Sequence, residues 1–129
     1  VKKTNVTVEE DTVVPRADLP ELLKHIKEVG IKYNFRSVCY GHAGDGNVHV
    51  RILKDALSDD YWKNEVPKGI REIFEKVVQL GGTISGEHGI GWIQIPYMDI
   101  KFGKTQLQLM RSIKNIFDPN NILNPGKIF

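Results

Sequence analysis

The segment from residue 36 to residue 53 constrains the fold of this chain more than any other. Two strand-like stretches flank the dipeptide Asp45-Gly46, which favours a type I′ turn between antiparallel strands. A two-residue turn at this point places His42 opposite His49, with their Cβ atoms about 4.5 to 5.5 Å apart. The segment therefore predicts a β-hairpin with two histidines on one face.

Alternation along the two strands divides their side chains between two faces. The apolar face, which belongs to the predicted core, carries Cys39, Ala43, Val48, Val50 and Ile52. The opposite face is polar near the turn, where it carries Tyr40, His42, His49 and Arg51. Further from the turn it carries Val38 and Leu53. The hairpin therefore predicts a site near its turn, and it places the single thiol in the core, where a cysteine acts as a small apolar group.

Helical periodicity predicts three helices outside the hairpin. The first follows the N-cap residue Asp18 and ends at Gly30, and the second covers residues 66–80. The third covers residues 104–117. Its apolar side chains, expected to point inward, are Leu107, Met110, Ile113, Ile116 and Phe117.

Further strands are indicated by short β-branched stretches. Residues 5–8 and 12–14 suggest a first strand that the acidic residues 9–11 interrupt, and residues 83–85 suggest a last one. Because helices alternate with strands and the hairpin is antiparallel, the pattern predicts an α+β fold, a mainly antiparallel sheet with helices on one face. A chain of 129 residues suits one domain, residues 1–129.

Composition excludes several classes of function. The 18 Lys and Arg residues are scattered and nearly balanced by 16 Asp and Glu, which argues against nucleic-acid binding. Apolar runs of a few residues fall far short of the roughly 20 needed for a membrane span. One cysteine cannot form an internal disulfide, so we expect a cytoplasmic protein. Because the chain begins at Val1 without a signal peptide, we expect it to be part of a longer polypeptide.

Three of the four histidines fall in two glycine-rich segments, residues 41–49 and 86–91. His42 and His49 can share one divalent cation, and Glu87 is the best candidate for a third ligand, because two histidines and a carboxylate leave a coordination position open. The alternative is that the glycines only turn the chain and the histidines bond to each other or to solvent.

Three more residues near these segments are candidates for chemistry. His88 follows Glu87, and both can serve one site only if the backbone between the flanking glycines is irregular. Arg51 lies on the histidine face, where it either binds a substrate carboxylate or forms a surface salt bridge. Tyr40 either donates a hydrogen bond to substrate or only packs.

Three motifs carry a resemblance to a known family. They are Gly41-His42-Ala43-Gly44-Asp45-Gly46-Asn47-Val48-His49, then Gly81-Gly82-Thr83-Ile84-Ser85-Gly86-Glu87-His88-Gly89-Ile90-Gly91, and Phe117-Asp118-Pro119 with Leu123-Asn124-Pro125-Gly126-Lys127. In this order they resemble the C-terminal domain of FAD-linked oxidases, which includes the glycolate oxidase flavin subunit, D-lactate dehydrogenases and D-2-hydroxyglutarate dehydrogenase. With residues 11–22, which resemble the segment upstream, the likeness covers nearly the whole chain.

The resemblance implies a ferredoxin-like α+β substrate domain that caps a separate N-terminal FAD-binding domain. It implies that His42, His49 and Glu87 hold a divalent metal and that His88 is the catalytic base. Zinc suits this ligand set, and so do manganese and iron. Asn124 resembles a position near the flavin, although a turn residue before Pro125 is the alternative.

The expected function follows from the resemblance. The full-length protein would oxidise a small 2-hydroxy acid to a 2-oxo acid by hydride transfer to FAD, while the isolated chain would be inactive. Its partners would be the N-terminal FAD domain and an electron-transfer subunit. One alternative is an FAD-linked relative acting on an aromatic alcohol or a lipid precursor, against which the paired histidines argue. The other is a freestanding metal-binding or regulatory module of ferredoxin-like shape.

Overall fold

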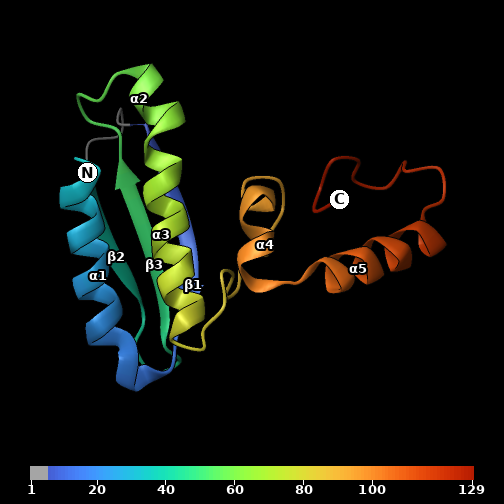
Figure 1. The fold of residues 1–129 in the computed structure, drawn as a ribbon, viewed down its shortest axis with the longest axis horizontal. Coiled ribbons are helices and arrows are strands. Elements are labelled where there is room, and N and C mark those ends of the chain that lie inside the picture. The colour runs from blue at the N-terminus through green and yellow to red at the C-terminus, as the bar shows by residue number, and fades with distance from the viewer. Residues whose placement is uncertain (1–5) are drawn as a thin grey trace. The chain divides into compact units, whose positions relative to one another are not determined.

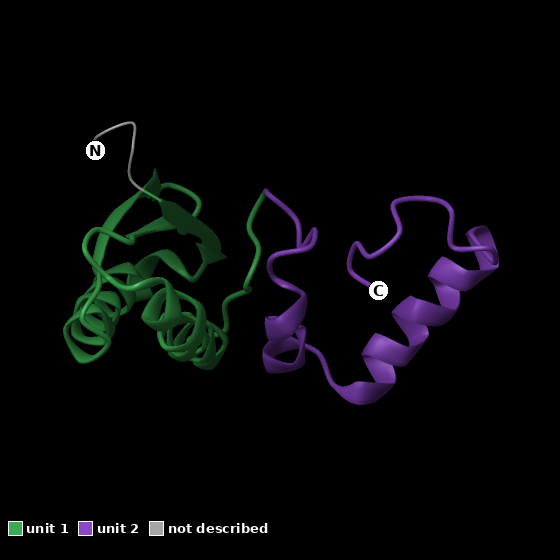
Figure 2. Cartoon of the chain, turned by 90° about the horizontal axis from the view of Figure 1, so that it is seen from above, with its two compact units in different colours: residues 1–87 green, residues 88–129 purple. Residues whose placement is uncertain are grey.

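The computed structural model describes residues 6–129 and divides the chain into two compact units, residues 1–87 and residues 88–129 (Figure 2). The first unit holds the sheet and the candidate ligands His42, His49 and Glu87. The second holds the C-terminal helices.

The first unit is an antiparallel sheet with helices on one face (Figure 1). Its strands are β1 (Thr7–Val13), β2 (Arg36–His42) and β3 (Asn47–Leu53), in the order β1-β3-β2. Its helices are α1 (Leu19–Lys32), α2 (Asp59–Asn64) and α3 (Val66–Gln79), with a 3₁₀ turn at Arg16–Asp18. The predicted α+β class is confirmed.

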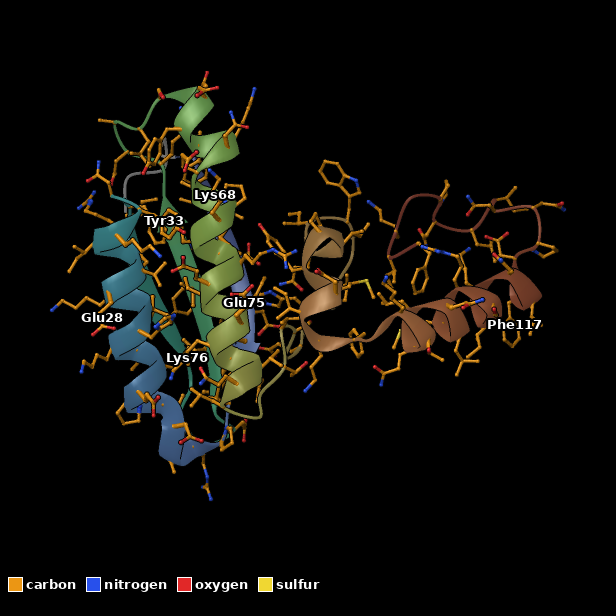
Figure 3. All side chains as sticks on the ribbon, in the orientation of Figure 1. Glu28, Tyr33, Lys68, Glu75, Lys76 and Phe117 are labelled. Atoms are coloured by element: carbon orange, nitrogen blue, oxygen red, sulfur yellow. The ribbon has the colours of Figure 1, made fainter. Side chains whose placement is uncertain are left out.

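The core lies between the sheet and the two long helices. Val50 and Ile52 of the central strand are fully buried, as are Phe74 and Val77 of α3. Helix α1 contributes Leu22, Ile26 and Val29. Polar contacts join the two helices at their edges, since the Tyr33 hydroxyl donates a 2.7 Å hydrogen bond to Glu72 and Lys76 forms an ion pair with Glu21 (Figure 3 labels Tyr33 and Lys76). The helices therefore cover one face of the sheet, and the site lies on the other face.

The predicted hairpin forms, but its turn and register are different. Four residues, 43–46, separate the strands, so that Tyr40 pairs with His49 and His42 pairs with Asn47. A type I′ turn needs positive φ at both central residues, and of Asp45 and Gly46 only the glycine has it, at 74°. The prediction that His42 faces His49 directly was therefore wrong by two residues. Because the shift is even, the residues within the two strands keep their predicted faces. Ala43, which was expected on the core face, lies exposed in the turn.

Three further predictions about the first unit need correction. Strand β1 runs without a break through Glu9, Glu10 and Asp11, which were expected to interrupt it; Asn5, where it was expected to begin, lies outside the described residues. Helix α1 was expected to end at Gly30 but continues to Lys32. Gly30 lies against Phe35, where an added Cβ would be 3.0 Å from the Phe35 carbonyl oxygen. The predicted strand at residues 83–85 is reduced to one bridge, between Val13 and Thr83.

The second unit contains a 3₁₀ turn at Ile95–Tyr97, the short helix α4 (Met98–Lys101) and the longer helix α5 (Lys104–Phe117). The predicted bounds of α5 are confirmed, but the expectation that its apolar side chains point inward is wrong, because the helix has no buried residue. Among residues 6–129 no helix combines the length and the apolar character that a membrane span requires.

Candidate metal centre

The three predicted metal ligands lie together on the polar side of the sheet. Nε2 of His49 is 3.1 Å from Oε1 of Glu87, and Nε2 of His42 is 3.6 Å from the same oxygen. One ligand atom from each residue can be chosen so that all three lie within 4.8 Å of one another. The structure therefore brings together residues that are up to 45 positions apart in the sequence.

These distances suit a shared divalent ion. Two ligand atoms bound at 2.0 to 2.2 Å with a tetrahedral angle between them lie about 3.3 to 3.6 Å apart. Both nitrogen-to-oxygen distances are within a few tenths of an ångström of that value. The side chains of His42 and Glu87 are more than half exposed, so an ion held by them would be open to solvent. The donor set fits a catalytic type of site, with three protein ligands and one open position.

Each ligand owes its position to a different part of the fold. His49 stands on the central strand β3, and its side chain is only 7% exposed. His42 ends β2, next to the four-residue turn, where Gly41 must be a glycine because a Cβ would lie 2.3 Å from the Asn47 carbonyl oxygen. Glu87 follows the Val13–Thr83 bridge, which ties its segment to the end of β1.

A buried carboxylate lies next to His49 and to the backbone of Glu87. Asp11 of β1, which has no exposed surface, pairs with His49 across the sheet. Its Oδ2 accepts hydrogen bonds from the backbone N–H groups of Gly86 (2.8 Å) and Glu87 (2.7 Å). Its Oδ1 accepts one from the Asn47 side chain (2.7 Å) and lies 3.7 Å from Nδ1 of His49. One side chain thus contacts the segments that supply two of the three ligands.

Arg51 and Tyr40 form a second polar group beside His49. Nε of Arg51 donates a 2.6 Å hydrogen bond to Glu9, and its NH2 group donates one of 2.8 Å to the Tyr40 hydroxyl. The Tyr40 ring lies 5.2 Å from the His49 ring, centroid to centroid. A hydrogen bond from Tyr40, aided by Arg51, holds the pKa of Glu9 below its ordinary value. Arg51 is thus already paired with a carboxylate of this chain.

His88 and Asn124 lie outside the helices and strands. His88 is exposed in a bend between Glu87 and Gly89, whose φ of 78° shows the irregular backbone that the sequence required. Asn124 has a φ of 48° and accepts a backbone hydrogen bond from Lys127, the geometry of a turn residue. The roles of His88 as a base and of Asn124 near a flavin stay predictions. Burial raises the pKa of the Cys39 thiol, which agrees with its expected inertness.

Sequence reasoning missed Glu9, Asp11 and Asn47. The signal was present, because alternation in an unbroken first strand puts Glu9 and Asp11 on one face and Glu10 on the other. The expectation that the acidic residues interrupt the strand hides this alternation.

Comparison with known proteins gives a consistent result. The family described as FAD linked oxidases, C-terminal domain, matches residues 1–128. The chain is 43% identical over 123 residues to the glycolate oxidase subunit GlcD of Bacillus subtilis (strain 168), covering 95% of this chain and 26% of that protein. It is 39% identical over 118 residues to a D-lactate dehydrogenase of Anaerostipes hadrus, covering 92% of this chain and 25% of that protein.

A third relative is the D-2-hydroxyglutarate dehydrogenase of Stutzerimonas stutzeri (strain A1501), 39% identical over 122 residues, with 92% of this chain and 26% of that protein covered. The chain therefore spans about a quarter of the length of these relatives. The family matches nearly every residue, and each of the three relatives matches more than nine-tenths of the chain. These matches decide the classification. This chain belongs to the FAD-linked oxidases, as their C-terminal domain.

Proposed function

We propose that this chain is the substrate domain of an FAD-dependent 2-hydroxy-acid dehydrogenase or oxidase of the glycolate or D-lactate type. The observation that supports this most directly is the convergence of His42, His49 and Glu87 at distances that suit one divalent ion. The relatives named for oxidation of glycolate, D-lactate and D-2-hydroxyglutarate support the choice of substrate class.

Each residue has a defined task in this proposal. His42, His49 and Glu87 hold the ion and leave its outward position for the substrate. When bound, the ion supplies positive charge that lowers the pKa of the substrate hydroxyl, and the flavin supplies the acceptor for the C2 hydride. His88 takes the hydroxyl proton. Tyr40 and Arg51 form the wall next to His49, where Arg51 binds the substrate carboxylate in competition with Glu9.

The partners in this proposal are an N-terminal FAD domain of the same polypeptide and an electron-transfer subunit, in the cytoplasm. The chain spans only a quarter of its relatives, and the open side of the metal centre leaves room for a second wall. Zinc, manganese and iron all suit two imidazoles and a carboxylate.

Metal binding is the first test of the proposed function. The purified chain, loaded with zinc, manganese or iron and freed of excess metal, is expected to retain about one ion per molecule, as measured by mass spectrometry. His42→Ala, His49→Ala and Glu87→Ala are each expected to lose it, because two ligands bind far more weakly than three. His25→Ala is the matched control, since His25 lies on α1 and contacts the backbone of Glu72.

Retention of metal by all three ligand variants, or no metal in the folded chain with any of these ions, would contradict the proposed centre. Stoichiometric binding that depends on the three ligands, combined with no oxidation of any 2-hydroxy acid by the full polypeptide, would instead favour the freestanding metal-binding module.

A further inference from the structure

Glu9 enters the proposed function only as a competitor for Arg51. It stands on β1 directly opposite Arg51 of β3, on the face of the sheet that carries His49. Nε of Arg51 donates a 2.6 Å hydrogen bond to Oε2 of Glu9, and the NH2 group of Arg51 forms an ion pair with the same oxygen. Strand pairing therefore sets a negative charge on the guanidinium that the proposed function uses.

We propose that Glu9 is a specificity-determining residue, which restricts the site to 2-hydroxy acids with an uncharged substituent on C2. Its carboxylate neutralises Arg51 and repels a second carboxylate on the substrate. Glycolate and D-lactate are then accepted, and D-2-hydroxyglutarate binds poorly. This role of Glu9 rests on the proposed function, which places the substrate beside His49.

Glu9 and Arg51 lie close enough to the metal ligands to act on a substrate there. An oxygen of the Glu9 carboxylate is within 4.8 Å of a ring nitrogen of His49. Arg51 occupies the next position after His49 on the same face, about 6 to 7 Å along the strand. A substrate bound beside His49 is therefore within range of the charges of both side chains.

The charges around His49 favour a substrate with a single carboxylate. The chain places there one guanidinium, that of Arg51, and three carboxylates, those of Glu9, Asp11 and Glu87. Their net charge is the one that a divalent cation balances. One substrate carboxylate can compete with Glu9 for Arg51, but a second one finds no further cation within this group of residues. A dianion therefore meets repulsion that a monoanion avoids.

The ion pair is also held in place by its surroundings. The side chain of Glu9 is only 25% exposed, so its displacement from Arg51 would leave a largely buried carboxylate without its guanidinium. The NH2 group of Arg51 donates a 2.8 Å hydrogen bond to the Tyr40 hydroxyl, and the guanidinium carbon lies 5.3 Å from the centre of the Tyr40 ring. Arg51 is therefore fixed beside Glu9 and does not turn freely toward a second substrate carboxylate.

Three variants test the role of the Glu9 charge. Glu9→Gln removes the charge and keeps the size of the side chain, and this change favours a dianion about twice as much in Coulomb energy as a monoanion at the same distance. Addition of Arg51→Gln to this variant removes the freed cation and should restore the wild-type preference. Glu75→Gln is the matched control, because it removes the same charge from an exposed position on α3, which covers the opposite face of the sheet (Figure 3 labels Glu75).

The experiment measures the dissociation constants of D-lactate and D-2-hydroxyglutarate for the zinc-loaded chain, by NMR titration followed at the Nε–H of Arg51. We expect the wild type to bind D-lactate more tightly. In Glu9→Gln both affinities should rise, and that for D-2-hydroxyglutarate should rise about tenfold more. In the double variant and in Glu75→Gln, the ratio of the two affinities should stay within about threefold of the wild-type ratio.

A wild-type chain that binds D-2-hydroxyglutarate as tightly as D-lactate overturns the role of Glu9 without any variant, so a failure of Glu9→Gln to fold leaves the test intact. A folded Glu9→Gln whose ratio stays within about threefold of the wild-type ratio also overturns it, because an ion pair that only stabilises the sheet predicts that result. Binding of neither acid by both chains has the same meaning, since Glu9 and Arg51 would then not face the substrate.

Failure of the proposed function is recognised separately, by zinc retention that is insensitive to His42→Ala and Glu87→Ala, or by no retention at all. The titration is then read without zinc, because the Nε–H of Arg51 reports on its own partners. D-2-hydroxyglutarate is expected to shift this resonance more in Glu9→Gln than in the wild type, and equal shifts in the two chains would overturn the role of Glu9.

Discussion

At the scale of single residues, the turn between β2 and β3 depends on Gly46. Its φ is 74°, and its carbonyl oxygen accepts a 3.0 Å hydrogen bond from the N–H of Val14. A Cβ at this position would lie 1.9 Å from the Val14 carbonyl oxygen, which is backbone and cannot rotate away. The turn therefore joins the hairpin to the end of β1 through a contact that only glycine allows.

Gly46→Ala is accordingly expected to destabilise the chain by about 2 to 4 kcal/mol, since left-handed backbone and a backbone clash both oppose it. Gly44→Ala is the control in the same turn, because its Cβ would meet no atom within 4 Å, and we expect a change within about 0.5 kcal/mol. Denaturant unfolding of both variants measures the difference. Equal stabilities would show that the contact with Val14 does not constrain the turn.

The sequence predicted the faces of the hairpin residues correctly and their partners incorrectly. Side-chain direction depends on whether two positions differ by an even or an odd number, so a register error of two residues kept His42 and His49 on one face. The partner of each residue depends on the turn, and the turn depends on the contact of Gly46 with Val14, 32 positions away. No local pattern contains that contact.

At the scale of elements, β1 shows why the deeper part of the site was not found from sequence. Strand pairing places the buried Asp11 opposite His49 and the half-buried Glu9 opposite Arg51, so a strand of low β-propensity supplies both carboxylates. Propensity disfavours Glu and Asp in strands, but here two of the three acidic side chains have partners on the histidine face. Tertiary pairing overrode the local preference.

The C-terminal end of α5 offers a test with pH. Asp118, which is 4% exposed, forms an ion pair with Lys114 and accepts hydrogen bonds from the N–H groups of Ile122 and Leu123. Lys114 first, and then the two N–H groups, hold the pKa of Asp118 below its ordinary value of 3.8. Because the folded pKa is lowered, the stabilisation is complete above the ordinary pKa and is lost as the pH falls through the folded pKa.

We therefore expect the amides of Ile122 and Leu123 to keep constant protection from hydrogen exchange between pH 7 and pH 5, after correction for intrinsic rates. Protection should fall only below the ordinary pKa. In Asp118→Asn it should be lower at pH 7 and should change little with pH. An identical acid-induced loss in wild type and Asp118→Asn would assign the effect to another group.

At the scale of the whole molecule, the two units differ in burial. The first unit has a hydrophobic core, whereas the main helix of the second unit, α5, has no buried residue. The sequence predicted a single domain for residues 1–129, and that stays a prediction beside the two compact units that the structure shows. Ile116 and Phe117 of α5 are 75% and 79% exposed, and Leu109, Ile113, Ile122 and Leu123 are exposed as well (Figure 3 labels Phe117). Helical periodicity identified the apolar stripe of α5 but could not identify what covers it.

We expect the proposed FAD domain to cover these six exposed apolar residues of α5 and of the segment that follows it. Single exposed apolar residues are ordinary, but six within fifteen residues are typical of an interface. In the isolated chain the α5 amides should exchange rapidly, because a helix without buried side chains opens at little cost in free energy. In the full polypeptide the same amides should be protected at least tenfold more strongly.

Helix α3 is the internal control for this comparison, since Ile73, Phe74 and Val77 already give it a core in the isolated chain. Its protection should change much less than that of α5 when the two samples are compared by hydrogen exchange and mass spectrometry. Equal protection of α5 in both samples would mean that the FAD domain packs elsewhere and that the exposed stripe serves a different contact. A rise confined to α5 and the adjoining residues 118–123 would locate the interface on the second unit.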